Sequence, residues 1–296
     1  MSRPVVSPAD AALRDLELHV RTTVEGLRQG LHRSPFHGFN AEFSQYRRYH
    51  PGDDLKHVDW KAFARTDRLF TRQFRETTSM GVLFALDISR SMGLPRSGSK
   101  LMTAAVAAGA LATLVIDQGD AAGVLALGEA THYVPPRSGS HHLQVALATL
   151  ARLEPGAAVP PAVTLRRVAA LMRRPGLVVV FSDFYEDAEA LSEVRRLTRA
   201  GHEVIVVQLT SRDELELTAS DATEFIDVET EQRIDVDAAR LRDTYRRQVE
   251  AFLSGMARAV AAEGLHYLRL VAGEPVEPAL RRFLIARRAA SERQTG

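Results

Sequence analysis

Side chains suited to chemistry cluster at the end of an apolar run. Asp87, Ser89 and Ser91 alternate along the loop that follows residues 82–86. One carboxylate and two hydroxyls supply the hard oxygen ligands that Mg²⁺, Ca²⁺ and Mn²⁺ bind in proteins. The spacing therefore predicts a divalent-cation site. The same residues also fit a polar turn in which Ser91 caps the next helix, and spacing alone leaves both interpretations open.

A second carboxylate follows a second apolar run. Asp183 comes just after residues 177–181, whose uninterrupted hydrophobicity is typical of a strand buried on both faces. Because the carboxyl ends of parallel strands meet at one edge of a sheet, we expect Asp87 and Asp183 to converge on one cation. Ser140, in the loop at 138–140, could bring a third hydroxyl to the same edge.

The elements that must position these side chains follow a regular alternation. Apolar segments of strand length occur at 82–86, 124–127, 132–134, 177–181, 203–209 and 266–270. Helical patterns occur at 100–117, 142–153, 164–173 and 188–200. Strands that alternate with helices form parallel sheets covered on both faces. The sequence therefore predicts a Rossmann-like α/β fold with a doubly wound, mostly parallel sheet.

Further segments flank this core. They are expected to form a helix at 8–29, a strand at 69–74, a hairpin at 224–236 and helices at 238–263 and 278–288. The strand at 69–74 is expected to pair with the strand that ends at Asp87. The chain accordingly divides into an N-terminal helix and extension at 1–79, the α/β domain at 80–275, and a basic C-terminal helix and tail at 276–296.

Composition narrows the classes of protein to which the chain can belong. It has 296 residues, and its 38 Lys and Arg balance 37 Asp and Glu, so no overall field favours nucleic acid or an anionic membrane. The absence of cysteine excludes disulfides, thiol nucleophiles and thiolate metal sites. The longest apolar run, 104–116, is shorter than the roughly 18 residues of a membrane span. We expect a cytoplasmic protein without a membrane span.

The serines and aspartates also match a known motif. Asp87-x-Ser89-x-Ser91, Ser140 after Gly139, and Asp183 after Ser182 resemble the metal-ion-dependent adhesion site (MIDAS) of von Willebrand factor A domains. The resemblance implies that the serines bind the ion directly, that the aspartates act largely through water, and that Ser140 replaces a threonine. It implies Mg²⁺, with Mn²⁺ or Ca²⁺ as alternatives.

A wider resemblance covers nearly the whole chain. The motifs that carry it are Glu42-Phe43, Tyr49-x-Pro51-Gly52-Asp53-Asp54, Asp59-Trp60-Lys61, Ala64-Arg65-Thr66, Phe74, Leu86-Asp87-x-Ser89-x-Ser91-Met92 and Tyr267-Leu268-Arg269. They resemble the bacterial domain-of-unknown-function 58 family, which has a von Willebrand factor A-like core and commonly occurs beside MoxR-type AAA+ ATPases. The resemblance implies an adaptor or assembly factor that works with such an ATPase on an unknown client.

The segment at 49–66 and its neighbours admit two interpretations. As structure, the acidic residues cap a turn and the tryptophan packs against the core. As function, the segment forms a recognition surface, because tryptophan and arginine are frequent interface anchors. The residues that would bind a partner are Arg47, Arg48, Asp53, Asp54, Trp60 and Arg65.

Two other patterns are interpreted mainly as structure. The segment at 93–100, which ends in Ser99-Lys100, is similar in sequence to a phosphate-binding loop. Its lysine comes one position later than in that motif, so a helix-capping loop is expected instead. The arginines of the last helix are expected to form a solvated face, with docking of an acidic partner as the alternative.

These observations favour a non-enzymatic protein that binds a partner through a metal ion. An acidic side chain of the partner would occupy an open coordination position of the ion. Two alternatives remain open: an Mg²⁺-dependent hydrolase or phosphotransferase in which Asp87 and Asp183 hold the catalytic ion, and a metal-free scaffold.

Overall fold

The computed structural model describes most of the chain. It covers residues 7–30, 46–48, 70–72, 79–95, 98–127, 131–157, 159–185, 189–217, 222–226 and 232–294. The chain forms two compact units, one made of Met1–Pro35 with Gly81–Gly296 and the other of Phe36–Met80.

A six-stranded sheet forms the centre of the larger unit. Its strand order is β10-β7-β6-β3-β4-β5. The strands are β3 (Gly81–Asp87), β4 (Ala121–Leu127), β5 (Thr131–Arg137), β6 (Leu177–Ser182), β7 (Glu203–Thr210) and β10 (His266–Val271). All neighbouring pairs are parallel except β4 with β5, which is antiparallel. The predicted α/β fold with a mostly parallel sheet is confirmed.

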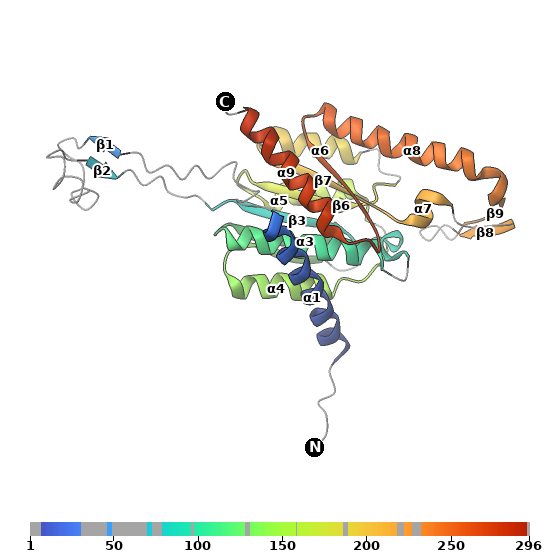
Figure 1. Cartoon of the computed structure of the whole chain (residues 1–296), viewed down its shortest axis with the longest axis horizontal. Helices are drawn as coiled ribbons and strands as arrows, with labels where there is room; N and C mark the ends of the chain where they lie inside the picture. Colours follow the sequence, from blue (N-terminus) through green and yellow to red (C-terminus); the bar gives the residue numbers. More distant parts are fainter. Residues whose placement is uncertain are drawn as a thin grey trace, which may run out of the picture. The chain divides into compact units, whose positions relative to one another are not determined.

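Helices cover both faces of this sheet (Figure 1). They are α1 (Pro8–Gly30), α3 (Lys100–Asp117), α4 (Ser140–Ala151), α5 (Pro161–Leu171), α6 (Ala190–Arg199), α7 (Arg212–Glu216), α8 (Ala238–Ala262) and α9 (Val276–Gln294). Helix α3 packs against α1, α4 and α9 on one side of the sheet, whereas α5, α6 and α8 share a core on the other side. The sheet is therefore doubly wound, as predicted.

Alternating residues of the central strands supply the two cores. Leu83 and Ala85 of β3 belong to the core under α5, α6 and α8, whereas Val82 and Phe84 point to the opposite face. All four are fully buried. A strand buried on both faces has no polar alternation, which is why the sequence shows an uninterrupted apolar run at this position.

Helix α3 is the most apolar helix of the unit. It begins after Ser99, whose Oγ accepts a hydrogen bond from the backbone N–H of Met102, so the predicted capping loop is confirmed. Among the described residues, α3 alone has the length and apolar character of a membrane-crossing helix, and 78% of it is buried inside the fold. Its apolar surface is used in packing against the sheet and three helices.

Helix α1 belongs to the larger unit. Its buried side chains are Leu16, Val20, Val24 and Leu27, and it contacts α3, α4 and α9. Residues four apart on a helix lie on one face, so this apolar stripe needs a partner surface, and the core helices provide it. The boundaries of the compact units thus differ from the expected division at residues 79 and 275, because α1 packs on α3, α4 and α9, and α9 also contacts β10.

In the smaller unit, the described residues form a two-stranded antiparallel ribbon of β1 (Tyr46–Arg48) and β2 (Phe70–Arg72). The prediction that the strand at 69–74 pairs with the strand ending at Asp87 is therefore wrong. Strand β3 lies between β4 and β6, and both of its edges are already hydrogen-bonded. A second predicted ribbon, β8 (Ala222–Ile226) with β9 (Arg233–Asp237), is present as an antiparallel pair.

Candidate metal centre

The candidate site lies where the winding of the sheet changes direction. From β3 the chain passes through α3 to β4 on one side, whereas β6, β7 and β10 follow one another on the other side of β3. Such a switch point opens a crevice at the carboxyl ends of the strands. Leu86 of β3 lies opposite Phe181 of β6, so Asp87 and Asp183 leave neighbouring strands at the same edge.

Asp87 is a buried carboxylate with both oxygens bound. Its Oδ1 accepts the backbone N–H of Ser89 at 2.8 Å, and its Oδ2 accepts the hydroxyl of Ser182 at 2.7 Å. Burial raises the pKa of Asp87; these hydrogen bonds act against the rise, and the nearby carboxylate of Asp183 adds to it. Asp87 is thus held rigidly in a place that is poor in positive charge.

A chain of oxygen atoms connects the serine loop with Asp183. Ser89 Oγ lies 3.0 Å from Ser91 Oγ, and the Ser91 hydroxyl donates to Asp183 Oδ2 at 2.9 Å. The second oxygen of Asp183 accepts the backbone N–H of Tyr185 at 3.3 Å. Ser89 is buried and Ser91 is half-buried, so the cluster is open to solvent on the side of Ser91.

Lys100, the first residue of α3, supplies a cation inside the site. Its side chain is fully buried, and its Nζ lies 2.7 Å from Asp183 Oδ2 and 2.6 Å from Glu214 Oε1. Burial alone would lower the pKa of Lys100, but the two carboxylates outweigh burial, and the pKa is raised. The ammonium also lies 5.6 Å from the centre of the Tyr185 ring. Lys100 is therefore charged and fixed by two ion pairs.

The sequence reasoning missed Lys100 and Glu214, although both carry a signal. A lysine in the first turn opposes the helix dipole, and this conflict indicates a specific partner. Ser211 and Glu214 have the spacing of a capping box, which the structure contains. In that box Glu214 Oε2 accepts the N–H of Ser211, and this leaves Oε1 for Lys100.

Buried polar side chains support the site from below. Ser182 accepts the backbone N–H of Phe184 at 3.0 Å, and Phe184 has a left-handed backbone with φ of 58°. Gln208 of β7 is fully buried and donates to the carbonyl oxygen of Asp183 at 3.1 Å. Gln208 in turn accepts the hydroxyl of Tyr267 at 2.7 Å. The turn after β6 is thus fixed by side chains from the neighbouring strands.

Ser140 lies away from this cluster. It is exposed at the start of α4, after β5. Because β5 runs antiparallel, its last residue Arg137 pairs with Ala122 near the start of β4, at the edge opposite to Asp87. His142 confirms this location, since its Nε2 lies 3.0 Å from the carbonyl oxygen of Ala122.

A different segment reaches the serine loop. Gly156 donates its backbone N–H to Ile88 at 2.8 Å and forms an isolated bridge with Ser89. Its neighbours Pro155 and Ala157 have no side-chain oxygen. The third hydroxyl expected from the motif is therefore not supplied from residues 155–157.

The residues expected to bind a partner are mostly outside the described part of the chain. Arg47 and Arg48 lie on β1. Four others lie outside the described residues: Asp53, Asp54, Trp60 and Arg65. In the last helix, Arg287 is buried in an ion pair with Glu203, so this arginine stabilises the fold instead of forming a solvated face.

The donor set fits a hard divalent cation with few protein ligands. Within the described residues no group of three or more His, Cys, Asp or Glu could hold a metal ion, so hydroxyls and water would supply most of the coordination shell. Ser89, Ser91 and Asp183 offer oxygens close together. When ionised, Asp87, Asp183 and Glu214 carry three negative charges against the one positive charge of Lys100. The two uncompensated charges match a divalent ion.

The chain is similar to known proteins in sequence and in fold. The family described as "Protein of unknown function DUF58" matches residues 45–252. An uncharacterized protein of Mycobacterium tuberculosis, Rv1480, is 29% identical over 285 residues, which cover 94% of this chain and 89% of that protein. The uncharacterized protein YeaD of Bacillus subtilis is 27% identical over 183 residues, which cover 61% of this chain and 43% of YeaD.

Solved structures with a similar fold include two proteins at low sequence identity. BatB of Bacteroides thetaiotaomicron is 16% identical with a TM-score of 0.46, and the match covers 72% of this chain and all of that one. The von Willebrand factor A domain of SpRpn10 is 10% identical with a TM-score of 0.41, and the match covers 69% of this chain and 94% of that domain.

Proposed function

This chain belongs to the family of proteins of unknown function DUF58, and we propose that it is a non-enzymatic, metal-dependent binding protein. Ser89 and Ser91 bind a divalent cation, preferably Mg²⁺, at the carboxyl edge of the sheet, and Asp87 and Asp183 hold its water ligands. A carboxylate of a partner protein completes the shell. The observation that carries this proposal is the meeting of two carboxylates and two hydroxyls at the switch point of the sheet.

The electrostatics support a carboxylate as the partner's ligand. The cluster has two more negative charges than positive ones, and Mg²⁺ brings the sum to zero. A partner's Asp or Glu then approaches a neutral site and replaces one water, which Mg²⁺ usually retains in an octahedral shell. Without the ion the same carboxylate meets uncompensated negative charge and is repelled. Partner binding thus depends on the cation.

The partner proposed is a MoxR-type AAA+ ATPase together with a client protein. This part rests on the family resemblance of the sequence. An adaptor needs a surface whose affinity can be switched, and an ion that must be present for binding is such a switch.

Lys100 favours a second candidate, a metal-free scaffold. Its ammonium already neutralises one charge at Asp183, where an ion would act. In this case the site is a buried ion-pair network whose task is to fix α3 and α7 at the edge of the sheet. Titration calorimetry with Mg²⁺ and Mn²⁺ separates the two candidates, since the scaffold shows no binding heat.

The decisive test compares two serines. Ser91→Ala removes a proposed ligand and is expected to weaken Mg²⁺ binding at least about tenfold, the lower end of the effect of losing supporting groups of a metal site. Ser140→Ala makes the same chemical change at the opposite edge and is expected to leave the affinity unchanged. If both variants bind Mg²⁺ like the parent protein, the proposed coordination is wrong.

Partner capture gives a second readout. Asp87→Ala is expected to abolish Mg²⁺-dependent capture of the partner from native cells, while circular dichroism shows a folded protein. Capture that continues undiminished in this variant, or in the presence of chelator, contradicts the metal bridge.

A further inference from the structure

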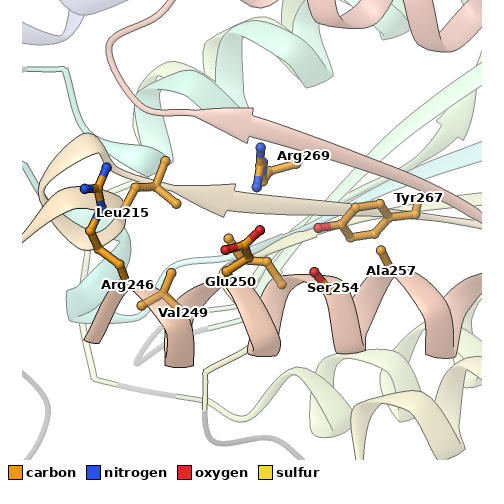
Figure 2. Close-up of a pocket in the computed structure, with 9 residues that line it drawn as sticks. Leu215, Arg246, Val249, Glu250, Ser254, Ala257, Tyr267 and Arg269 are labelled. Carbon is orange, nitrogen blue, oxygen red and sulfur yellow. The ribbon is translucent and has the colours of Figure 1, made fainter. Parts of the chain in front are cut away.

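A groove lies between α8 and β10, outside the candidate metal centre (Figure 2). Its volume is about 530 Å³, which is within the range of ligand-binding clefts. Leu215 of α7 closes one end, and Tyr267 and Arg269 of β10 form one wall. The groove shares Tyr267 with the hydrogen-bond network that supports the ion site, but none of the proposed ion ligands lines it.

The opposite wall is one face of α8. It contains Arg246, Val249, Glu250, Leu253 and Ala257. Glu250 follows Arg246 at a spacing of four, and Leu253 and Ala257 follow Val249 at the same spacing, so these residues share one face of the helix. The first and last of these positions are eleven residues apart, so the wall is about 16 Å long at 1.5 Å per residue. An extended peptide of about five residues has the same length. The groove is therefore elongated, and its α8 wall has apolar side chains at Val249 and Leu253.

Three charged side chains border the groove. Arg246, Glu250 and Arg269 are exposed, and they form no ion pair with one another or with the rest of the described chain. Figure 2 shows Glu250 below Arg269, and Arg246 at the end near Leu215. Two guanidinium groups against one carboxylate give the lining a net positive charge. Guanidinium groups pair with carboxylates in a defined, often bidentate geometry.

The β10 wall is rigid. Tyr267 donates its hydroxyl to the buried Gln208, which fixes the ring in the wall. Leu268 points into the core, so Tyr267 and Arg269, two residues apart on a strand, lie on the same side. A fixed wall lowers the entropic cost of ordering a ligand.

We propose that this groove binds a short, extended acidic segment of a partner protein. Apolar side chains of the segment contact Val249 and Leu253, and its carboxylates pair with Arg246 and Arg269. Glu250 lies one helical turn after Arg246 and below Arg269 in Figure 2, and it opposes a segment with too high a negative charge. The inference does not depend on the metal site, and it gives the chain a second contact surface.

The test measures binding of a fluorescein-labelled ELELE pentapeptide, blocked at both ends, by fluorescence anisotropy in EDTA. Arg246→Gln and Arg269→Gln are each expected to weaken binding about fivefold, as for a well-formed exposed ion pair. Glu250→Gln has the opposite charge effect and is expected to tighten binding. Arg258→Gln, an exposed position on α8 outside the groove, is the matched control and leaves binding unchanged.

Several outcomes overturn the proposal. They are the absence of peptide binding, equal binding of a QLQLQ peptide, and equal effects of Arg258→Gln and Arg269→Gln. Binding of glutarate but not of the peptide, with the same arginine dependence, identifies a small-molecule site instead. The measurements are repeated with Asp87→Ala. Peptide binding that persists in this variant supports the groove even where the ion site fails, whereas its loss contradicts an independent surface.

Discussion

A single residue, Lys100, determines the net charge of the candidate site. It is a fully buried ammonium between Asp183 and Glu214, in a place where a lysine normally loses its charge. The two carboxylates keep it charged. The ammonium of Lys100 reduces the net charge of the site from three negative charges to two, so one divalent ion makes the site neutral. Without Lys100 the same ion would leave the site negative, and a partner's carboxylate would be repelled.

Replacing Lys100 tests this role. Lys100→Met replaces the charged side chain by an apolar one of similar length. The variant leaves Asp183 and Glu214 without their cation. Removing one partner of a buried ion pair costs about 3–5 kcal/mol, so we expect a loss of that size in the free energy of unfolding, measured with urea in EDTA.

Two further measurements sharpen this test. Adding Glu214→Gln to Lys100→Met is expected to recover part of the loss, because one of the two carboxylates left without a cation is then removed. Mg²⁺ is expected to stabilise Lys100→Met more than the parent protein. A loss below about 1 kcal/mol for Lys100→Met would show that the ion pairs contribute no more than exposed ones.

Two histidines predict how stability depends on pH. Burial lowers the pKa of His202, against a backbone hydrogen bond at Gly176. Burial and Arg287 lower the pKa of His266, against Glu203. The unfolded chain takes up these protons near the ordinary value of 6.5, whereas the folded chain does so only at lower pH. The stability that these two histidines contribute is therefore fully present above pH 6.5, and it is lost as the pH falls below 6.5.

The measurement is urea unfolding at about pH 7.5 and about pH 5.5. The double variant His202→Gln/His266→Gln is expected to lose less stability between these two values than the parent protein. An equal loss in both proteins would mean that other groups set this part of the pH dependence.

At the scale of elements, the direction of β5 determines which loops can reach the metal edge. Strands β3 and β6 are parallel and adjacent, so Asp87 and Asp183 must meet. Strand β5 is antiparallel, so Ser140 leaves the sheet at the other edge. The segment around Gly156, which starts after α4 has crossed back, reaches Ser89 instead.

The sequence predicts some of these elements and not others, for physical reasons. The apolar runs that end at Asp87 and Asp183 predicted their strands and their common edge, because a strand buried on both faces leaves a clear pattern. The strands predicted at 124–127 and 132–134 are only four residues apart, too close for a parallel crossover, so the antiparallel direction could have been inferred. Lys100 and Glu214 could not be paired from sequence, because 114 residues separate them and only the fold brings them together.

Replacement of two glycines by alanine is expected to have opposite effects on stability, one in strand β4 and one in helix α8. A Cβ on Gly123 of β4 would lie 2.6 Å from the carbonyl oxygen of Val134, next to a shift in the β4–β5 pairing. The backbone cannot yield easily, so Gly123→Ala is expected to cost about 1–3 kcal/mol. Gly255 inside α8 has open space at this position. Gly255→Ala is expected to stabilise the protein by about 0.5–1 kcal/mol.

Thermal unfolding of both variants checks this pair. The same added methyl group is expected to lower the midpoint at Gly123 and to raise it at Gly255. A midpoint that rises at both positions would show that the crowding at Gly123 is relieved by movement of β5, and that packing does not fix the pairing shift.

At the scale of the whole molecule, the first and last helices complete one core. Arg281 of α9 donates to the carbonyl oxygen of Gly26 in α1 at 2.7 Å, across 255 positions of the chain. Helix α1 covers α3 and α4, and α9 contacts α3 and β10. Residues 36–80 form a separate compact unit between α1 and β3 in the sequence. The larger unit is therefore discontinuous in sequence, and we predict that it requires its N-terminal helix to fold.

Deletion of residues 1–30 tests this requirement. The deletion removes Leu16, Val20, Val24 and Leu27, which are at most 4% exposed. Burying such side chains contributes about 1.5–3 kcal/mol each, or about 6–12 kcal/mol together, which is comparable to the whole stability of a domain, about 5–15 kcal/mol. We expect the truncated chain to lose cooperative unfolding in circular dichroism, and a synthetic peptide of residues 7–30 to restore it. Leu18→Gln, at a position 63% exposed on the same helix, is the control and should melt like the parent protein. A truncated chain that unfolds cooperatively at the parent midpoint would show that α1 is an appendage and that α3 and α4 form a complete layer without it.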